Sequence, residues 1–271
     1  MTRASIQPSG TERAGAFALY ALQWRAALRM AFADRVNFAL QASGMLINNV
    51  VMLSLWWLFF AGFKRIGDWQ QADMALLMGI TMLVVGASGV GFGGYRDLAA
   101  TLLRGDLDAL LTQPKALLPR LLARESMAIS WGDLFSGGVL LAFFAELPWA
   151  SVPWLVLAVC AGTVVFVATA VAFATLAFWI AGARSLARDL VDWIVLFSSY
   201  PGSIYQGPVR VLAYTLLPAG FVVMLPLQMV RAPSAASVAM VLGGVALYAA
   251  IAFVAFDLGL RRYRRGQSPH S

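Results

Sequence analysis

Long runs of apolar residues, separated by short polar segments, dominate the chain from its first third to its end. A bilayer core about 30 Å thick needs about 20 mostly apolar residues per helix, and six stretches approach this length. The predicted spans are residues 38–62, 74–93, 126–147, 152–181, 190–204 and 235–258. The pattern therefore predicts an all-α, polytopic membrane protein with six transmembrane helices spread over residues 38–260.

The segment before the first span shows a different periodicity. Arg25 and Arg29 lie one helical turn apart, and apolar residues recur at helical spacing on another face. This apolar face comprises Phe17, Tyr20, Trp24, Leu28, Ala31 and Phe32. An amphipathic helix of this kind lies in the headgroup plane. Residues 1–37 are therefore predicted to form a cytoplasmic N-terminus and an interfacial helix; an extension of the first span is the alternative.

Prolines interrupt the stretch that follows the fifth span, at positions 201, 208, 218, 226 and 233. Each proline removes a backbone donor and disturbs the preceding turn, so short helices joined by turns are expected. Non-helical backbone at membrane depth survives only where protein or a water-filled cavity satisfies it, which predicts a re-entrant segment over 201–230. Candidate gate or exit residues there are Tyr200, Pro201, Tyr205 and Arg210, with interface anchoring as the alternative role of the tyrosines.

The charge distribution predicts the topology. The net charge is +7, and sixteen of the twenty Lys and Arg residues fall on one side if both termini are cytoplasmic. Only Lys64, Arg65, Arg210 and Arg231 fall outside. This asymmetry follows the positive-inside rule for an even number of spans, and it places residues 261–271 in a basic cytoplasmic tail. Because the basic residues form short clusters rather than a stripe on a soluble fold, no nucleic-acid partner is expected.

The cytoplasmic loop over residues 95–124 is long enough to carry its own helix. Asp106 and Asp108 favour a helix N-terminus, an apolar face follows, and a proline ends the run. Leu107, Leu110 and Leu111 form the apolar face, and Pro114 is the proline. The alternative location for this helix is the membrane surface, but anionic lipid repels its acidic start, so a protein partner is the better prediction.

Polar residues inside the spans are few, and they give little scope for chemistry. Cys160 and His270 are the only cysteine and histidine, so no catalytic residue, metal site or cofactor is predicted. Candidate polar pathway residues are Asn48, Asn49 and Asp133, although buried asparagines more often form interhelical hydrogen bonds. For Asp133, Arg124 or a water-filled vestibule is the expected partner.

The glycines Gly86, Gly89 and Gly93 indicate a helix-packing interface. Their small size at helical spacing predicts close packing of the second span against a neighbouring helix. The motif GxGxxG formed by Gly89, Gly91 and Gly94 lies at the end of an apolar run instead of between a strand and a helix, so it does not indicate a dinucleotide site. The sequence holds no Walker A motif, so an ATP-driven protein of this kind needs a separate ATPase.

Three segments together resemble the permeases of type-2 ATP-binding-cassette (ABC) exporters. They are the amphipathic N-terminal helix, RGDLDALLTQP between the second and third spans, and SYPGSIYQGPVRVLAYTLLPAGFVVMLPL before the last span. The resemblance covers nearly the whole chain and depends on the order and spacing of these segments.

The resemblance implies a six-span half-transporter in the bacterial inner membrane. It pairs with a second permease, as a homodimer or a heterodimer, and exports its substrate using separate ATP-binding-cassette ATPase subunits, with membrane lipids around it. RGDLDALLTQP is then the coupling helix that binds the ATPase. The alternative functions are a secondary transporter or channel, for which broken helices are also typical, and a membrane enzyme, for which catalytic residues are scarce.

Overall fold

The computed structural model describes residues 10–63, 65, 69–103, 107, 116–180 and 182–266. Within these residues the chain forms helices and turns and no β-strand, which confirms the all-α prediction. The long helices are α1 (Gly10–Ala31), α2 (Arg35–Gly62), α3 (Gln71–Phe92), α7 (Ala128–Phe144), α8 (Val152–Thr175), α9 (Ala183–Ser198) and α12 (Ala235–Arg264). The short ones are η1 (Gly93–Tyr95), α4 (Leu98–Leu103), α6 (Leu117–Leu122), η2 (Trp149–Ser151), η3 (Leu176–Phe178), η4 (Gly202–Ile204), α10 (Gly207–Tyr214), η5 (Gly220–Met224) and α11 (Leu225–Arg231).

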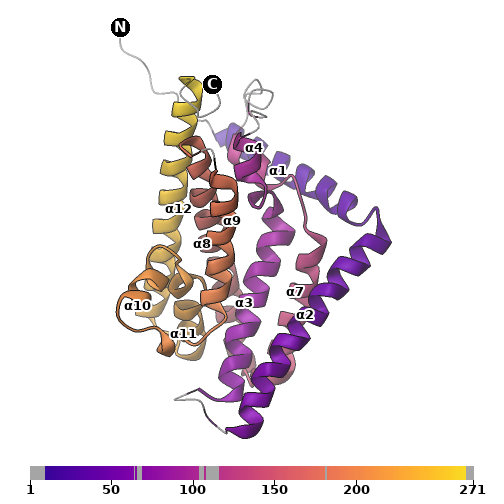
Figure 1. Cartoon of the computed structure of the whole chain (residues 1–271), viewed down its shortest axis with the longest axis vertical. Helices are drawn as coiled ribbons and strands as arrows, with labels where there is room; N and C mark the ends of the chain where they lie inside the picture. Colours follow the sequence, from indigo (N-terminus) through magenta and orange to yellow (C-terminus); the bar gives the residue numbers. More distant parts are fainter. Residues whose placement is uncertain are drawn as a thin grey trace.

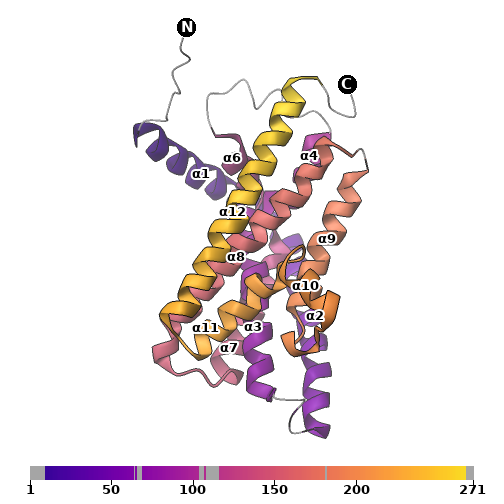
Figure 2. The ribbon, with the colours of Figure 1, turned by 90° about the vertical axis from the view of Figure 1, so that its left-hand side faces the viewer.

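The long helices α2, α3, α7, α8 and α12 form an elongated bundle with two ends, and α9 starts near the upper end and stops partway down (Figures 1 and 2). The upper end carries α1, α4 and the last turns of α12, and the lower end carries α11 and the start of α3 (Figures 1 and 2). Both α1, near the start of the chain, and the end of α12 therefore belong to the upper end. This is the arrangement expected for an even number of crossings.

A sharp turn separates α1 from α2. The carboxylate of Asp34 accepts a hydrogen bond from the backbone N–H of Asn37 at 3.0 Å and caps α2, as aspartate commonly does at a helix N-terminus. Two side chains attach α1 to the upper end of α3: Tyr20 Oη donates to the carbonyl of Gly91 at 2.5 Å, and Trp24 Nε1 donates to that of Val90 at 2.8 Å. The first helix is thus a separate element and not an extension of α2.

Helix α3 forms the centre of the bundle and packs mainly against α7 and α8. Its glycines permit the close approach to α7: a Cβ atom at Gly86 would lie 2.8 Å from the backbone nitrogen of Leu134, and one at Gly89 would overlap Ser130. A Cβ atom at Gly93 would lie 2.6 Å from the carbonyl oxygen of Glu125. The prediction that these small residues serve helix packing is confirmed.

Four helical stretches of the described chain are long and apolar enough to cross a membrane. They are Arg35–Gly62, Gln71–Leu103, Trp149–Phe178 and Ala235–Arg264, and Ala128–Phe144 and Gly220–Arg231 are shorter apolar helices. The predicted spans at 126–147 and 190–204 overlap α7 and α9, but α9 is not one of these apolar helices. Helix α9 begins at Ala183, earlier than predicted, because the polar sequence ARSLARD continues the helix beyond its apolar part.

The chain after α9 forms the short helices η4, α10, η5 and α11, interrupted by turns, as the prolines predict. The carbonyl of Ser198, at the end of α9, accepts a hydrogen bond from Thr81 Oγ1 at 3.0 Å. Thr81 lies about halfway along α3. The turn between α10 and α11 contacts the middle of α12, where Tyr248 Oη donates to the carbonyl of Thr215 at 2.8 Å. At the end of α11, Arg231 forms an ion pair with Asp73 in the first turn of α3.

Candidate functional site

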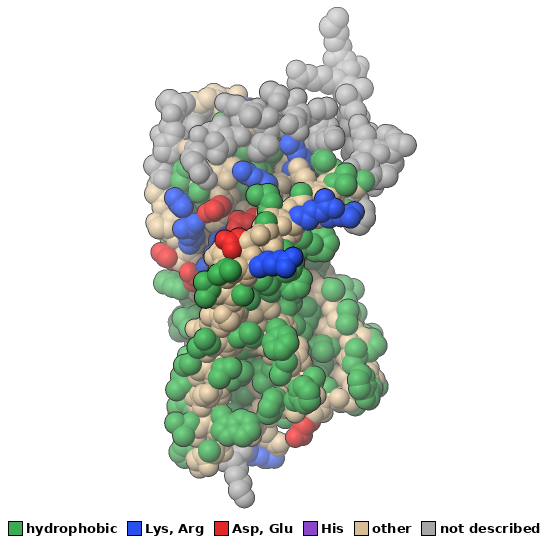
Figure 3. Space-filling model, turned by 90° about the vertical axis from the view of Figure 1, so that its right-hand side faces the viewer, with side chains coloured by type: hydrophobic (Ala, Val, Ile, Leu, Met, Phe, Trp, Pro, Cys, Tyr) green, Lys and Arg blue, Asp and Glu red, His purple; other side chains and the backbone are tan. Residues whose placement is uncertain are grey.

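Charged side chains gather at the upper end of the bundle, while apolar side chains cover the face below them (Figure 3). There Arg188 of α9 donates to the Asp97 carboxylate at 2.6 Å, and Arg184 lies 4.0 Å from the same oxygen. These contacts join the start of α9 to the segment between α3 and α4. Each side chain is about half exposed, so the network positions the two segments while leaving charge at the surface.

A cavity of about 350 Å³ opens beside this network, with Asp97, Leu121 and Glu125 among its lining residues. Partial burial raises the pKa of Glu125, the negative charge of Asp97 raises it further, and Arg96 and Arg124 oppose the shift. The two carboxylates are therefore close enough to influence each other across the cavity. Neither belongs to the candidate residues named from sequence, because their positions in the chain give no sign that the fold brings them together.

Of the predicted coupling residues, the structure describes only Leu107. Its side chain is fully buried in the hydrophobic core of the chain, together with Leu98, Leu102 and Leu121. Leu107 therefore packs against its own bundle. Asp106, Asp108, Leu110, Leu111 and Pro114 lie outside the described residues. The helices that flank this loop both pack against the bundle: α4 contacts α8, α9 and η3, and α6 contacts α1 and η1.

The candidate pathway residues Asn49 and Asp133 meet in the interface between α2 and α7. Asn49 Nδ2 donates to Asp133 Oδ1 at 3.0 Å and to Ser136 Oγ at 3.2 Å, and all three side chains are buried. The expected partner Arg124 does not pair with Asp133; the amide of Asn49 takes its place because the bundle brings α2 against this face of α7. Asn48, one residue away, is exposed, and its amide nitrogen lies 4.0 Å from Met45 Sδ of its own helix.

Aromatic side chains surround the candidate exit residues at the lower end. The rings of Tyr205 and Phe197 stack with centroids 5.1 Å apart, and Tyr205 Oη donates to the Phe197 carbonyl at 2.8 Å. Tyr200 meets Trp56 of α2 edge-to-face at 5.9 Å. Pro201 is buried and directly precedes η4, whereas Arg210 is exposed on α10. Tyr200 and Tyr205 thus face different neighbours and do not form one ring pair.

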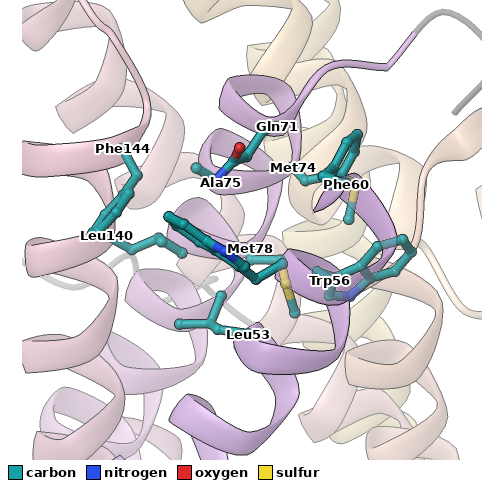
Figure 4. Close-up of a pocket in the computed structure, with 10 residues that line it drawn as sticks. Leu53, Trp56, Phe60, Gln71, Met74, Ala75, Met78, Leu140 and Phe144 are labelled. Carbon is teal, nitrogen blue, oxygen red and sulfur yellow. The ribbon is translucent and has the colours of Figure 1, made fainter. Parts of the chain in front are cut away.

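An apolar pocket of about 110 Å³ opens between α2, α3 and α7 near the lower end (Figure 4). Trp56 and Phe60 of α2, Met74 and Met78 of α3 and Phe144 of α7 contribute to its wall. The side chain of Gln71 brings a polar group to it. The sequence gives no sign of this pocket, since no spacing along the chain relates the three helices.

These features describe a polytopic helical membrane protein with a charged end, an apolar belt and a broken segment at the opposite end. The family model described as "ABC-2 family transporter protein" matches residues 46–266. The chain therefore belongs to the ABC-2 transporter family and is an ABC-2 type permease. Searches among curated proteins and among solved structures found no match.

Proposed function

We propose that this chain is the membrane-spanning subunit of an ATP-driven exporter whose ATPase is a separate polypeptide. The family match over residues 46–266 carries this proposal, since ABC-2 permeases typically work with an ATPase subunit. The absence of a Walker A motif from the sequence agrees with it. On this proposal the chain performs no chemistry itself; it lines the pathway and transmits the movement of the ATPase.

The upper end is the proposed cytoplasmic end, with six crossings and both termini inside the cell. Its basic side chains include Arg184, Arg188, Arg261 and Arg262, and the positive-inside rule assigns such clusters to the cytoplasm. Helix α9 is the shortest of the proposed crossings, because its 16 residues span about 24 Å. On this proposal, the turn after α9 and helix α10 cover the remaining depth of the membrane.

The segment over residues 201–230 is the proposed re-entrant element at the outer mouth. The contacts of Arg231 with the first turn of α3 and of Thr215 with the middle of α12 support a path that enters and returns. The π-helical segment η5 also packs deeply: a Cβ atom at Gly162 of α8 would meet the carbonyl oxygen of Val222. A displacement of this segment would open the lower end without breaking a transmembrane helix.

A second permease copy or a sister permease is the proposed partner within the membrane. Large apolar side chains remain exposed along α2, α9 and α12, among them Leu58, Trp193 and Phe253. Lipid accepts such faces without cost, and so does another apolar helix.

ATPase binding is assigned to the coupling loop, and replacement of Leu110 by aspartate tests it. A charge at this position would be buried without a partner in the ATPase contact, so less ATPase should co-purify while the permease inserts and unfolds as before. Gln113→Asp adds the same charge to a polar position of the same loop and is the matched control. Equal recovery of ATPase with Leu110→Asp and with the unmodified chain would exclude this docking surface.

Thiol labelling in sealed cells tests the proposed orientation. In a Cys160→Ser background, single cysteines at Asp68 and Glu146 should react with a membrane-impermeant reagent added outside, because the reagent needs water and an open path. Cysteines at Gln113 and Gln267 should react only after the cells are opened. Labelling of either of these two positions in sealed cells would reverse the assignment of the two ends.

A further inference from the structure

A second cavity at the lower end has a different character from the apolar pocket. It has a volume of about 480 Å³ and lies between the segment that contains η4 and α10 on one side and α11 on the other. Polar and aromatic groups line it, including Trp69, Tyr205, Gln206, Tyr214 and Gln228, together with the two arginines Arg210 and Arg231. A volume of this size accommodates a small molecule or a lipid headgroup.

The two arginines have unequal partners. Arg231 pairs with Asp73 of α3, and its guanidinium lies over the ring of Trp69 with its central carbon 5.2 Å from the centroid. Arg210 lies over the ring of Tyr214 at 5.9 Å and forms no ion pair among the described residues. Asp73 therefore neutralises the charge of Arg231, whereas no carboxylate among the described residues neutralises the charge of Arg210.

The guanidinium of Arg210, which lies over the Tyr214 ring, fits one chemical class of ligand. We propose that this cavity binds an anionic phosphate or carboxylate group, held mainly by Arg210, with the Gln206 and Gln228 amides as further donors. A guanidinium presents paired N–H groups that match the oxygens of such anions, and stacking on an aromatic ring fixes its plane. The anion belongs either to an outer-leaflet phospholipid or to a soluble molecule, since the two share this chemistry.

The site goes beyond the transport function proposed above and is tested without the ATPase. Binding is measured on the purified permease in neutral detergent with two probes: a short-chain phosphatidylglycerol, followed by native mass spectrometry, and inorganic phosphate, followed by titration calorimetry. Replacement of Arg210 by glutamine should weaken binding of the active probe about tenfold, the usual effect of losing a charge-assisted hydrogen bond. Arg65→Gln, which removes an arginine that does not line the cavity, should leave binding unchanged.

The two probes separate the sources of the anion. Arg210-dependent binding of phosphatidylglycerol alone identifies a lipid headgroup site, and Arg210-dependent binding of phosphate identifies a site for soluble anions. Arg210→Lys, which keeps the charge but not the planar fork, should retain part of the affinity and shows that the effect is not loss of folding. The proposal is overturned if neither probe depends on Arg210, or if Arg65→Gln weakens binding equally, because diffuse surface charge then explains it.

Discussion

Helices α2 and α3 are both long and apolar, and they are neighbours in the chain, yet their surroundings differ greatly. In the most apolar part of the stretch that contains α3, 72% of the residues are buried inside the bundle, whereas the corresponding part of α2 is 11% buried. Helix α3 packs against α7 and α8 and contacts α9, while α2 packs almost entirely against α7. One helix is the core of the fold, and the other presents most of its surface to lipid or to a partner.

The difference shows which sequence signals report on packing in a membrane protein. Hydropathy reports that a segment leaves water, but lipid and protein are equally apolar, so hydropathy does not distinguish them. Small and polar residues do indicate which helix faces pack against protein and which face lipid. Gly86 of α3 faces Leu134 closely, whereas a Cβ atom at Gly44 of α2 would meet nothing within 4 Å. Asn49 is the polar residue that attaches α2 to α7.

The largest expected effect comes from leucine at the two glycine positions. Gly86→Leu should lower the free energy of unfolding by about 3 kcal/mol or prevent folding, because the side chain has no space against the Leu134 backbone. Gly44→Leu should be neutral or slightly stabilising, since leucine favours a helix over glycine. Thermal unfolding in detergent measures both. Similar losses for the two variants would contradict the assignment of α3 to the core and α2 to the periphery.

A smaller effect is expected when Asn49 is replaced by alanine. The buried carboxyl group of Asp133 then loses its donor, which should cost about 1–3 kcal/mol and loosen α2 from α7. Asn48→Ala is the matched control, because the Asn48 side chain is exposed and forms no hydrogen bond outside α2 among the described residues. Comparable unfolding temperatures for the two variants would mean that apolar packing alone holds α2 in place.

Much of this fold was predictable from sequence because the bilayer requires long apolar helices. The predicted spans at 38–62, 74–93 and 235–258 match α2, α3 and α12 closely. The start of α9 was the main error of position, since a helix does not end where its apolar run ends. The pairing of Asp257 and Arg261 at 2.7 Å was also predictable, as residues one helical turn apart share a face.

The site was less predictable, because its contacts join residues that are distant in the chain. Asn49 and Asp133 were each identified as candidates, yet only the packing of α2 on α7 makes them partners and leaves Asn48 exposed. The ion pair between Arg231 and Asp73 has no signal in sequence spacing, although both residues lie at predicted outer ends. Leu107 was assigned to an apolar face for a partner, but it fills the core of its own bundle.

The smallest expected effect concerns the pocket between the two helices. Ala75 of α3 faces this pocket of about 110 Å³, which is comparable with the volume that an apolar cavity needs to hold a small hydrocarbon (Figure 4). Ala75→Met adds a flexible apolar side chain that can enter the space and contact Trp56 and Phe144. Filling the cavity should raise the free energy of unfolding by about 1 kcal/mol.

The same substitution at Ala158 of α8 is the matched control, because that side chain is fully buried and does not line the pocket. Ala158→Met should destabilise the bundle by about 1–3 kcal/mol, since a methionine there displaces well-packed neighbours. Opposite signs for the two variants in thermal unfolding would show that the contact between α2 and α3 is loosely packed. If Ala75→Met also destabilises, the region between the helices is already filled, and α2 is held to α3 more tightly than its low burial indicates.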